Sequence, residues 1–226
     1  MNEREITGRA RTHIVDVEDL ACGMHYEAVA SFLAMRDAAA SAGVQIKVPS
    51  GFRDFATQLN IWNRKWRGER PLLSRDGQPL NRSDLSDAEM VDVILTWSAI
   101  PGGSRHHWGT DVDVIDAATM PSGYQVRLVT EEYAADGVFA KLNAWLDTNL
   151  HRFGFFRPFH TDRGGVSPEP WHISYAPVSM PALESLSLAV LRRTLSESNL
   201  EGKAFVLDRL PEIYTRYLLN IDTPRA

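Results

Sequence analysis

Two short segments of this 226-residue chain concentrate side chains that bind metal ions. Residues 104–113 read Ser-Arg-His-His-Trp-Gly-Thr-Asp-Val-Asp, and residues 169–172 read Glu-Pro-Trp-His. A catalytic zinc ion typically takes three imidazole or carboxylate ligands and keeps a fourth position for water. One histidine and one aspartate from the first segment, together with His172 from the second, supply such a set. Glu169 then remains to take a proton from water, the general-base role that carboxylates play in zinc hydrolases.

Strand periodicity indicates how some of these side chains would be oriented. In a strand that includes Val112 and Val114, Asp111 and Asp113 share the face opposite the two valines. An adjacent strand that carries His172 would therefore direct its imidazole and an aspartate toward a common point. The pattern leaves open which of the two aspartates takes part.

Sequence context says less about how Glu169 and the two histidines of the first segment are placed. Pro170 favours an extended backbone at Glu169, which predicts that this carboxylate lies at the strand entrance, beside the metal rather than beneath it. His106 and His107 are equally suited as ligands by residue type, so the choice between them also stays open.

The rest of the chain predicts more helix than strand. Apolar residues at helical spacing predict helices over residues 26–42, from Asp54 to about residue 66, from the capping box at Ser86 to about residue 100, and over residues 139–150, 183–191 and 213–218. Short strands are expected over residues 45–50, 112–114 and 171–175, and residues 67–85 form an excursion rich in glycine and proline. We therefore expect one α+β domain over residues 1–226, with a small, mostly antiparallel sheet flanked by helices. Its motif-bearing core would cover about residues 45–177, and its C-terminal helices residues 181–219.

Composition excludes some partners. The net charge is −5, from 24 basic and 29 acidic side chains, which argues against nucleic acid and anionic membranes because both select basic surfaces. No apolar run approaches the ~20 residues of a membrane span. The first residues lack the apolar segment of a secretion signal, and the single cysteine forms no internal disulfide. These features predict a cytoplasmic protein, or a periplasmic one if a leader has been removed; the oligomeric state stays open.

Three motifs in order resemble those of the VanY-like D-alanyl-D-alanine metallocarboxypeptidases. That family belongs to the LAS metallopeptidases, whose fold is shared with the hedgehog signalling domain. Its Ser-x-His-x-x-Gly-x-Ala-x-Asp pattern is similar to residues 104–113, and its Glu-x-Trp-His pattern to residues 169–172. Its Ser-Gly-aromatic-Arg element followed by Gln is similar to residues 50–53 and Gln58. The resemblance implies the hedgehog/DD-peptidase fold and one zinc ion per chain, with the ligands His106, Asp113 and His172 and the catalytic base Glu169.

Arg53 is the second catalytic candidate. Placed in a cleft, its guanidinium would polarise the scissile carbonyl or bind a substrate carboxylate in a bidentate manner. We predict substrate contacts for Arg53, Gln58 and Ser104.

One position departs from the family pattern. Asp111 stands where the family usually has alanine, so it would either orient a ligand histidine or compete with Asp113 for the metal. We expect His107 and Trp108 to serve packing, with His107 as an alternative ligand.

The resemblance implies release of the C-terminal D-alanine from peptidoglycan stem peptides. We predict an L,D-carboxypeptidase that acts on tetrapeptide muropeptides during cell-wall recycling, because D,D-activity in the cytoplasm would trim the pentapeptide precursor of wall synthesis. The alternatives are a D,D-carboxypeptidase acting on pentapeptides, a peptidoglycan endopeptidase and, outside enzymes, a zinc-stabilised binding module.

Overall fold

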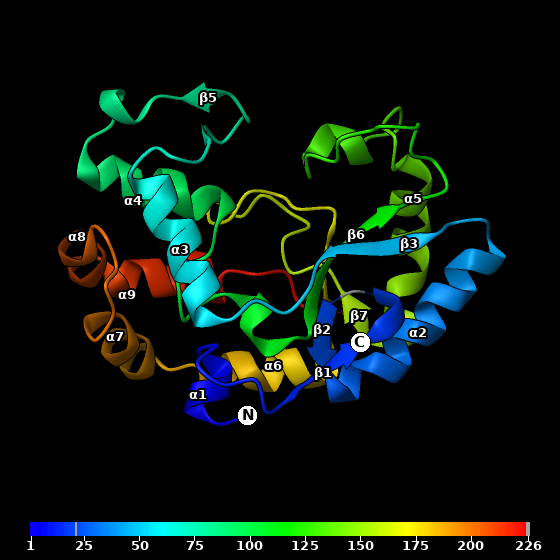
Figure 1. The fold of residues 1–226 in the computed structure, drawn as a ribbon, viewed down its shortest axis with the longest axis horizontal. Coiled ribbons are helices and arrows are strands. Elements are labelled where there is room, and N and C mark those ends of the chain that lie inside the picture. Colours follow the sequence, from blue (N-terminus) through cyan, green and yellow to red (C-terminus); the bar gives the residue numbers. More distant parts are fainter. Residues whose placement is uncertain (21, 225–226) are drawn as a thin grey trace.

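A four-stranded antiparallel sheet lies at the centre of the computed structural model, which describes residues 1–20 and 22–224 (Figure 1). The strand order is β3-β6-β8-β7, and every neighbouring pair is antiparallel. The strands span Ile46–Ser50 (β3), Asp111–Asp116 (β6), Phe155–Phe156 (β7) and His172–Tyr175 (β8). Two further hairpins pair β1 (Ile14–Val17) with β2 (Cys22–His25) and β4 (Leu72–Leu73) with β5 (Pro79–Leu80). The expected α+β class with a small antiparallel sheet is confirmed.

Helices surround the sheet. The α-helices are α1 (Glu3–Ile6), α2 (Tyr26–Ser41), α3 (Phe55–Trp66), α4 (Asp87–Trp97), α5 (Ala140–Asn149), α6 (Ala176–Ser185), α7 (Leu188–Ser196), α8 (Lys203–Asp208) and α9 (Leu210–Ile213). Short 3-10 turns are η1 (Glu18–Leu20), η2 (Arg82–Asp84), η3 (Arg105–Trp108), η4 (Thr130–Tyr133) and η5 (Leu150–Phe153), and a π-helical turn covers Tyr214–Leu219. Among the described residues, none of the helices combines the length and apolar character that a membrane span needs.

The helix starts that the sequence predicts are present. Asp54 accepts a hydrogen bond from the backbone N–H of Thr57 at 2.7 Å, and Ser86 and Glu89 form the expected capping box. The single helix expected over residues 183–191 is wrong, because the chain breaks between α6 and α7. There the Ser187 side chain accepts a hydrogen bond from the Val190 N–H and starts a new helix. The β1–β2 hairpin, which no pattern predicted, precedes α2.

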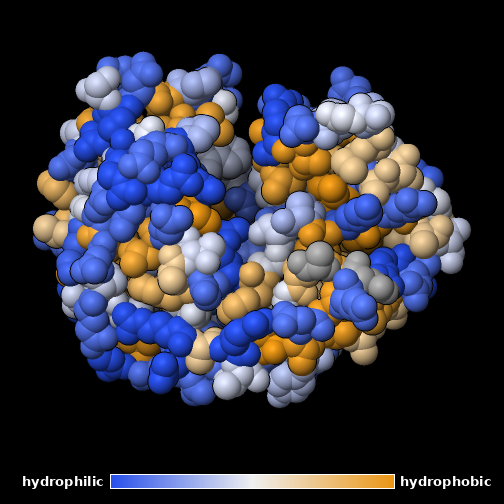
Figure 2. Space-filling model, viewed as in Figure 1, coloured by the Kyte–Doolittle hydropathy of each residue, from blue (hydrophilic) through white to orange (hydrophobic). Residues whose placement is uncertain are grey.

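Two apolar cores lie on either side of the central cleft. One packs α3 and α4 against the C-terminal helices and includes Trp62, Ile94, Leu191, Val206 and Ile213. The other packs the sheet against α2 and α5 and includes Phe32, Val112, Val114, Phe139 and Ile173. Figure 2 shows the surface hollowed between the corresponding halves of the molecule. The predicted strand orientation holds, since both valines of β6 are fully buried in the second core.

The turn between η3 and β6 depends on Gly109. Its φ of 66° lies in the left-handed region that favours glycine. A Cβ at this position would collide with the Ile14 side chain and lie 2.7 Å from the backbone nitrogen of His25. The turn reverses the chain between two candidate ligands, so its geometry sets how His106 and Asp113 approach each other.

We predict that Gly109→Ala lowers the free energy of unfolding by about 3 kcal/mol, because it adds a backbone collision to the cost of a left-handed alanine. Gly77→Ala is the matched control, since Gly77 has a φ of 78° but open space where a Cβ would lie. The control should lose only about 1 kcal/mol. Urea unfolding of the three proteins measures both values, and equal losses would show that the close approach at Gly109 is easily relieved.

Candidate active site and metal centre

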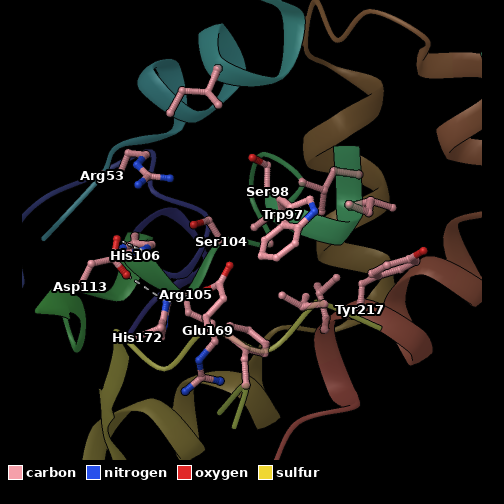
Figure 3. Close-up of a pocket in the computed structure, with 18 of the residues that line it drawn as sticks. Arg53, Trp97, Ser98, Ser104, Arg105, His106, Asp113, Glu169, His172 and Tyr217 are labelled. Carbon is pink, nitrogen blue, oxygen red and sulfur yellow. Dashed lines mark ion pairs between the residues drawn. The ribbon is translucent and has the colours of Figure 1, made fainter. Parts of the chain in front are cut away.

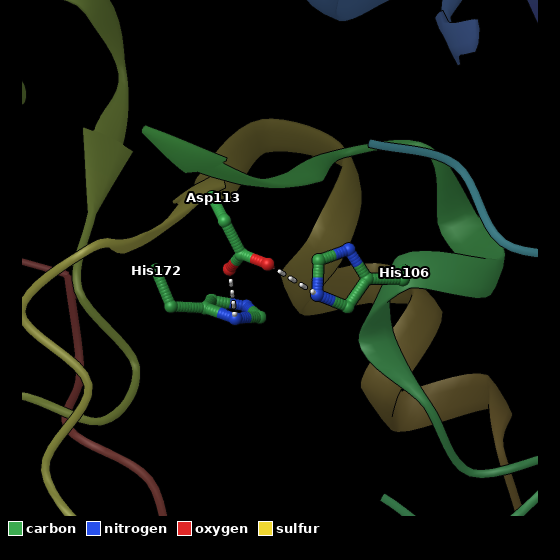
Figure 4. A group of neighbouring side chains, drawn as sticks. All are labelled: His106, Asp113 and His172. Atoms are coloured by element: carbon green, nitrogen blue, oxygen red, sulfur yellow. Dashed lines mark ion pairs between the residues drawn. The ribbon is translucent and has the colours of Figure 1, made fainter. Parts of the chain in front are cut away.

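The pairing of β6 with β8 places Asp113 directly opposite His172. His106 comes from η3, immediately before the Gly109 turn. The three side chains are buried, and each offers a ligand atom within 4.8 Å of the other two (Figure 4). The predicted convergence of two adjacent strands on a common point is therefore seen for Asp113. Ligation by these three residues stays a prediction, which their geometry supports.

His106 turns its Nε2 atom toward Asp113. Its Nδ1 lies 3.0 Å from the carbonyl oxygen of Gly51, and a carbonyl can only accept, so Nδ1–H is the donor. The lone pair is then on Nε2, 3.7 Å from Asp113 Oδ2. Burial lowers the pKa of His106 to about 3, which keeps the ring neutral, as metal binding requires.

His172 is oriented in the opposite sense. Its Nε2–H donates to Asp111 Oδ1 at 3.0 Å, and its Nδ1 lies 3.4 Å from Asp113 Oδ1 and 3.3 Å from Glu169 Oε2. Burial opposes protonation, but the neighbouring carboxylates of Asp111, Asp113 and Glu169 outweigh it and raise the pKa of His172 well above its ordinary value. The surroundings thus favour positive charge beside Nδ1, which a divalent cation also supplies.

The donor set fits such a cation. Asp113 Oδ1 is buried and makes no hydrogen bond among the described residues. The Asp113 carboxylate faces one imidazole nitrogen of His106 and one of His172, and the other ring nitrogen of each histidine is held by a hydrogen-bond acceptor. Two imidazoles and one carboxylate are a ligand set found in catalytic zinc sites, and acceptors behind the histidines are the usual support.

Asp111 holds His172 and does not join the metal-binding group. Its Oδ1 also accepts from Arg105 Nε at 2.7 Å, and its Oδ2 accepts from Thr110 Oγ1 at 2.7 Å. Burial alone would raise the pKa of Asp111, but Arg105, His172 and Thr110 together hold it well below its usual range. Of the two roles considered for Asp111, the geometry favours the orienting one.

Arg105 is the residue near the site that sequence reasoning missed. It is buried, donates to Ser174 Oγ at 2.7 Å and lies over the Trp108 ring at 4.8 Å. The sequence did contain a signal for Arg105: Asp111 stands on a strand expected to be buried, and a buried carboxylate needs a cation nearby. His107 lies apart from the metal-binding group: it is fully buried, with Nδ1 bonded to the Arg53 carbonyl at 2.6 Å.

Glu169 lies beside the metal-binding group, at the edge of the cleft. Its backbone N–H donates to the Phe159 carbonyl at 2.8 Å, and its side chain is 13% exposed. Burial raises the pKa of Glu169, with the Asp113 charge adding to the shift and His172 opposing it. A carboxyl group with a raised pKa that faces both the cleft and a candidate ligand is well suited to carry a proton.

Arg53 lines the same cleft and is held from two sides. It donates from Nη1 to Gln58 Oε1 at 2.7 Å and from Nη2 to Ser50 Oγ at 3.0 Å. Gln58 is fully buried and donates to the Ala99 carbonyl at 2.6 Å. This geometry makes Gln58 a positioning residue for Arg53, while its direct contact with substrate stays a prediction.

The cleft has a volume of about 370 Å³ and contains every predicted site residue except Gln58 in its lining. Ser104 also lies here, and its Oγ is buried without a hydrogen-bond partner among the described residues. Figure 3 shows Arg53, Ser104 and Glu169 around a common space, with Trp97 and Tyr217 on the side away from the metal-binding group. Apolar side chains complete the walls, namely Ile61, Leu95, Phe159, Leu183 and Leu218.

Comparison with known families matches residues 22–178 to the VanY model, described as D-alanyl-D-alanine carboxypeptidase. The chain belongs to this family. It is therefore a metallocarboxypeptidase acting on peptidoglycan peptides, and the family resemblance of its motifs is confirmed. The matched segment contains all seven predicted site residues and ends before α7.

Two curated relatives are similar to this chain, and one of them carries the same description as the family. An uncharacterized protein of Haemophilus influenzae is 35% identical over 127 residues, which are 55% of this chain and 97% of that protein. A D-alanyl-D-alanine carboxypeptidase of Enterococcus faecalis is 32% identical over 145 residues, which are 62% of this chain but 43% of that protein.

Solved structures confirm the fold. VanYB in complex with D-alanine-D-alanine has a TM-score of 0.54 at 22% identity, with 82% of this chain and 89% of that chain covered. A vancomycin-resistance D,D-pentapeptidase VanY variant in complex with Zn(II) has a TM-score of 0.53 at 22% identity, covering 85% and 88%. The LD-carboxypeptidase LdcB has a TM-score of 0.52 at 18% identity, covering 88% and 79%.

We predict that His106→Ala, Asp113→Ala and His172→Ala each abolish stoichiometric zinc binding. Asp111→Asn should retain zinc with an affinity about 10- to 100-fold lower, because it loosens only the support behind His172. His151→Ala, at an exposed histidine, is the control and should bind as the unaltered protein does. Elemental analysis and competition with a chelator measure both quantities, and full zinc content in the His106 or His172 variant would refute the ligand assignment.

Proposed function

We propose that this protein is a zinc-dependent L,D-carboxypeptidase that releases the terminal D-alanine from tetrapeptide stem peptides of peptidoglycan. The observation that carries the proposal is the convergence of His106, Asp113 and His172 beside Glu169 in one cleft. Family membership supplies the reaction class, and the cleft supplies the argument for the substrate.

Support for zinc comes from the donor set and from the Zn(II) complex of the VanY relative. The described residues contain one group of this kind, so we propose one ion per chain. When bound, zinc would lower the pKa of water to about 7 and polarise the scissile carbonyl. The hydrogen bonds that the two histidines donate to the Gly51 carbonyl and the Asp111 carboxylate hold them in the tautomers that such binding needs.

The protein groups divide the remaining work. Glu169 takes a proton from the attacking water and later delivers it to the leaving D-alanine amine. Arg53, fixed by Ser50 and Gln58, directs its guanidinium into the cleft, where it stabilises the negative charge that develops on the carbonyl oxygen. The unpartnered Ser104 hydroxyl is available to hydrogen-bond the substrate.

The size of the cleft supports the L,D reading. In a D,D reaction both residues at the scissile bond carry only a methyl group, whereas in the L,D reaction a long diamino acid precedes D-alanine. A space of about 370 Å³ with aromatic and aliphatic walls suits the longer side chain. We place this step in the recycling of wall fragments in the cytoplasm, where an enzyme without D,D-activity spares the pentapeptide precursor.

Glu169→Gln should retain zinc and fold but lose activity by about 10²- to 10⁴-fold, because it removes the proton carrier and leaves the ligands in place. Glu184→Gln, on the exposed side of α6, is the matched control and should remain fully active. The measurement is D-alanine release by the zinc-loaded proteins, alongside their metal content. Activity of the Glu169 variant within tenfold of the unaltered protein would remove this residue from the mechanism.

The bond cleaved is tested by offering tetrapeptide and pentapeptide muropeptides in equal amounts. We expect D-alanine to leave the tetrapeptide at least tenfold faster, because the cleft accepts the diamino acid directly before the scissile bond. Mass spectrometry of the products follows both substrates. Rapid conversion of pentapeptide to a stable tetrapeptide would assign D,D-activity instead, and cleavage within cross-linked dimers would assign an endopeptidase.

A further inference from the structure

Three cationic side chains that line the cleft have no anionic partner. Lys65, Arg70 and Arg127 belong to its wall, and none makes an ion pair or a side-chain hydrogen bond with the described residues. Other arginines of the protein do find partners, such as Arg82 with Asp87 and Arg209 with Asp92. No role in the proposed reaction uses these three cations.

Lys65 is the least solvated of the three. It is only partly exposed, on the face of α3 that also carries Ile61 and Gln58. Burial lowers the pKa of Lys65 to about 8, with repulsion from Arg70 and Arg53 adding to the shift and Glu169 opposing it. It is unfavourable to remove an ammonium group partly from water when it has no partner. An anion bound beside Lys65 would supply that partner, so its binding would be favoured.

Arg127 approaches the cleft from the opposite half, on a loop that is held in an unusual conformation. Its neighbour Leu128 has a φ of 54°, which is rare for a side chain of this size. The buried Glu132 carboxylate accepts hydrogen bonds from the backbone N–H groups of Arg127 at 3.1 Å and Val129 at 3.3 Å. It also accepts one from the Tyr124 hydroxyl at 2.8 Å. The backbone of this loop is therefore fixed from behind, while the Arg127 side chain itself is exposed.

We propose that Lys65 and Arg70, with Arg127 across the cleft, bind a second carboxylate of the substrate, carried by the side chain of the residue before the terminal D-alanine. The inference rests on the proposed carboxypeptidase function and names its substrate class. That class is stem peptides whose diamino acid ends in a free carboxylate, as diaminopimelate does, rather than in an amine alone, as lysine does.

The separation of the cations favours a second anion over the terminal carboxylate. Arg53 precedes α3, whereas Lys65 lies near its end, and ten residues of helix rise about 15 Å. Arg53 already has the side chains of Ser50 and Gln58 as partners, whereas Lys65 has none among the described residues, so the far end of this band of charge is the part that lacks an anion. The long side chain of a diamino acid carries its carboxylate away from the scissile bond, along the cleft and toward Lys65.

The test compares tetrapeptides L-alanyl-γ-D-glutamyl-X-D-alanine in which X is diaminopimelate, its side-chain amide or lysine. We expect kcat/KM of the unaltered protein to be about tenfold or more higher for free diaminopimelate, the size of a charge-assisted hydrogen bond. Lys65→Gln/Arg70→Gln should lose that preference, so that the ratio of kcat/KM for the diaminopimelate peptide to kcat/KM for the amide and lysine peptides falls to near one. Arg127→Gln should lose part of it.

Lys47→Gln is the matched control, because Lys47 is exposed on β3, away from the cleft lining. This variant should keep the full preference. A fourth peptide with an amidated D-glutamyl carboxylate separates the two possible anions. If amidation of the D-glutamyl residue removes the preference and amidation of diaminopimelate does not, the cations bind the D-glutamyl carboxylate and the proposal is wrong. Equal losses on all peptides in the double variant would assign the cations to the terminal carboxylate and also overturn it.

Binding of the tripeptide products separates this proposal from the proposed function, because they have no D-alanine left to release. By calorimetry, the unaltered protein should bind the diaminopimelate tripeptide about tenfold more tightly than the lysine tripeptide, and the double variant should bind both alike. If none of the tetrapeptides is hydrolysed but the diaminopimelate tripeptide still binds more tightly, the proposed carboxypeptidase specificity is refuted and the anion site is supported. Hydrolysis without any difference in affinity or rate would refute the anion site alone.

Discussion

The antiparallel register of β6 with its two neighbours controls the whole site. Asp113 lies opposite His172 of β8 on one side and opposite Ser50 of β3 on the other, and Ser50 in turn holds the Arg53 guanidinium. Side chains alternate along a strand, so a slip of one residue would turn Asp113 into the core and a valine into the cleft. The same strand buries Val112 and Val114 fully, and this burial opposes any such slip.

A buried network of charges behind the metal-binding group completes this arrangement. Asp111, Arg105 and His172 are almost entirely removed from water, and each finds a charged or polar partner. Removing one member of a buried ion pair typically costs about 3–5 kcal/mol, because the other charge is left uncompensated. Arg105 therefore compensates the buried charge of Asp111, with Thr110 and His172 as its further partners. The Asp111 carboxylate also fixes the tautomer and the orientation of the His172 ring.

The cleft owes its chemistry to segments that are far apart in the chain. Arg53 and Lys65 come from the start and end of α3, Ser104 from the loop before η3, Glu169 from the loop before β8, and Arg127 from the loop held by Glu132. The two apolar cores are rigid supports on either side, and the cleft between them is where polar groups stay accessible. Such a division between packed supports and a cleft lined from loops and helix ends is typical of catalytic sites.

By itself the sequence determined the residue types of the site, the caps of α3 and α4 and the two faces of β6. These features depend on local periodicity and on hydrogen bonds within a few residues. The choice of Asp113 over Asp111 as the member of the metal-binding group was decided only by the tertiary structure, which surrounds one aspartate with Arg105 and Thr110 and leaves the other facing two imidazoles. The same holds for the break between α6 and α7 and for the unpartnered Lys65, since partners across the fold are set by packing between distant segments. A pattern in the chain reports which face a side chain occupies, whereas burial and partner together decide what it does there.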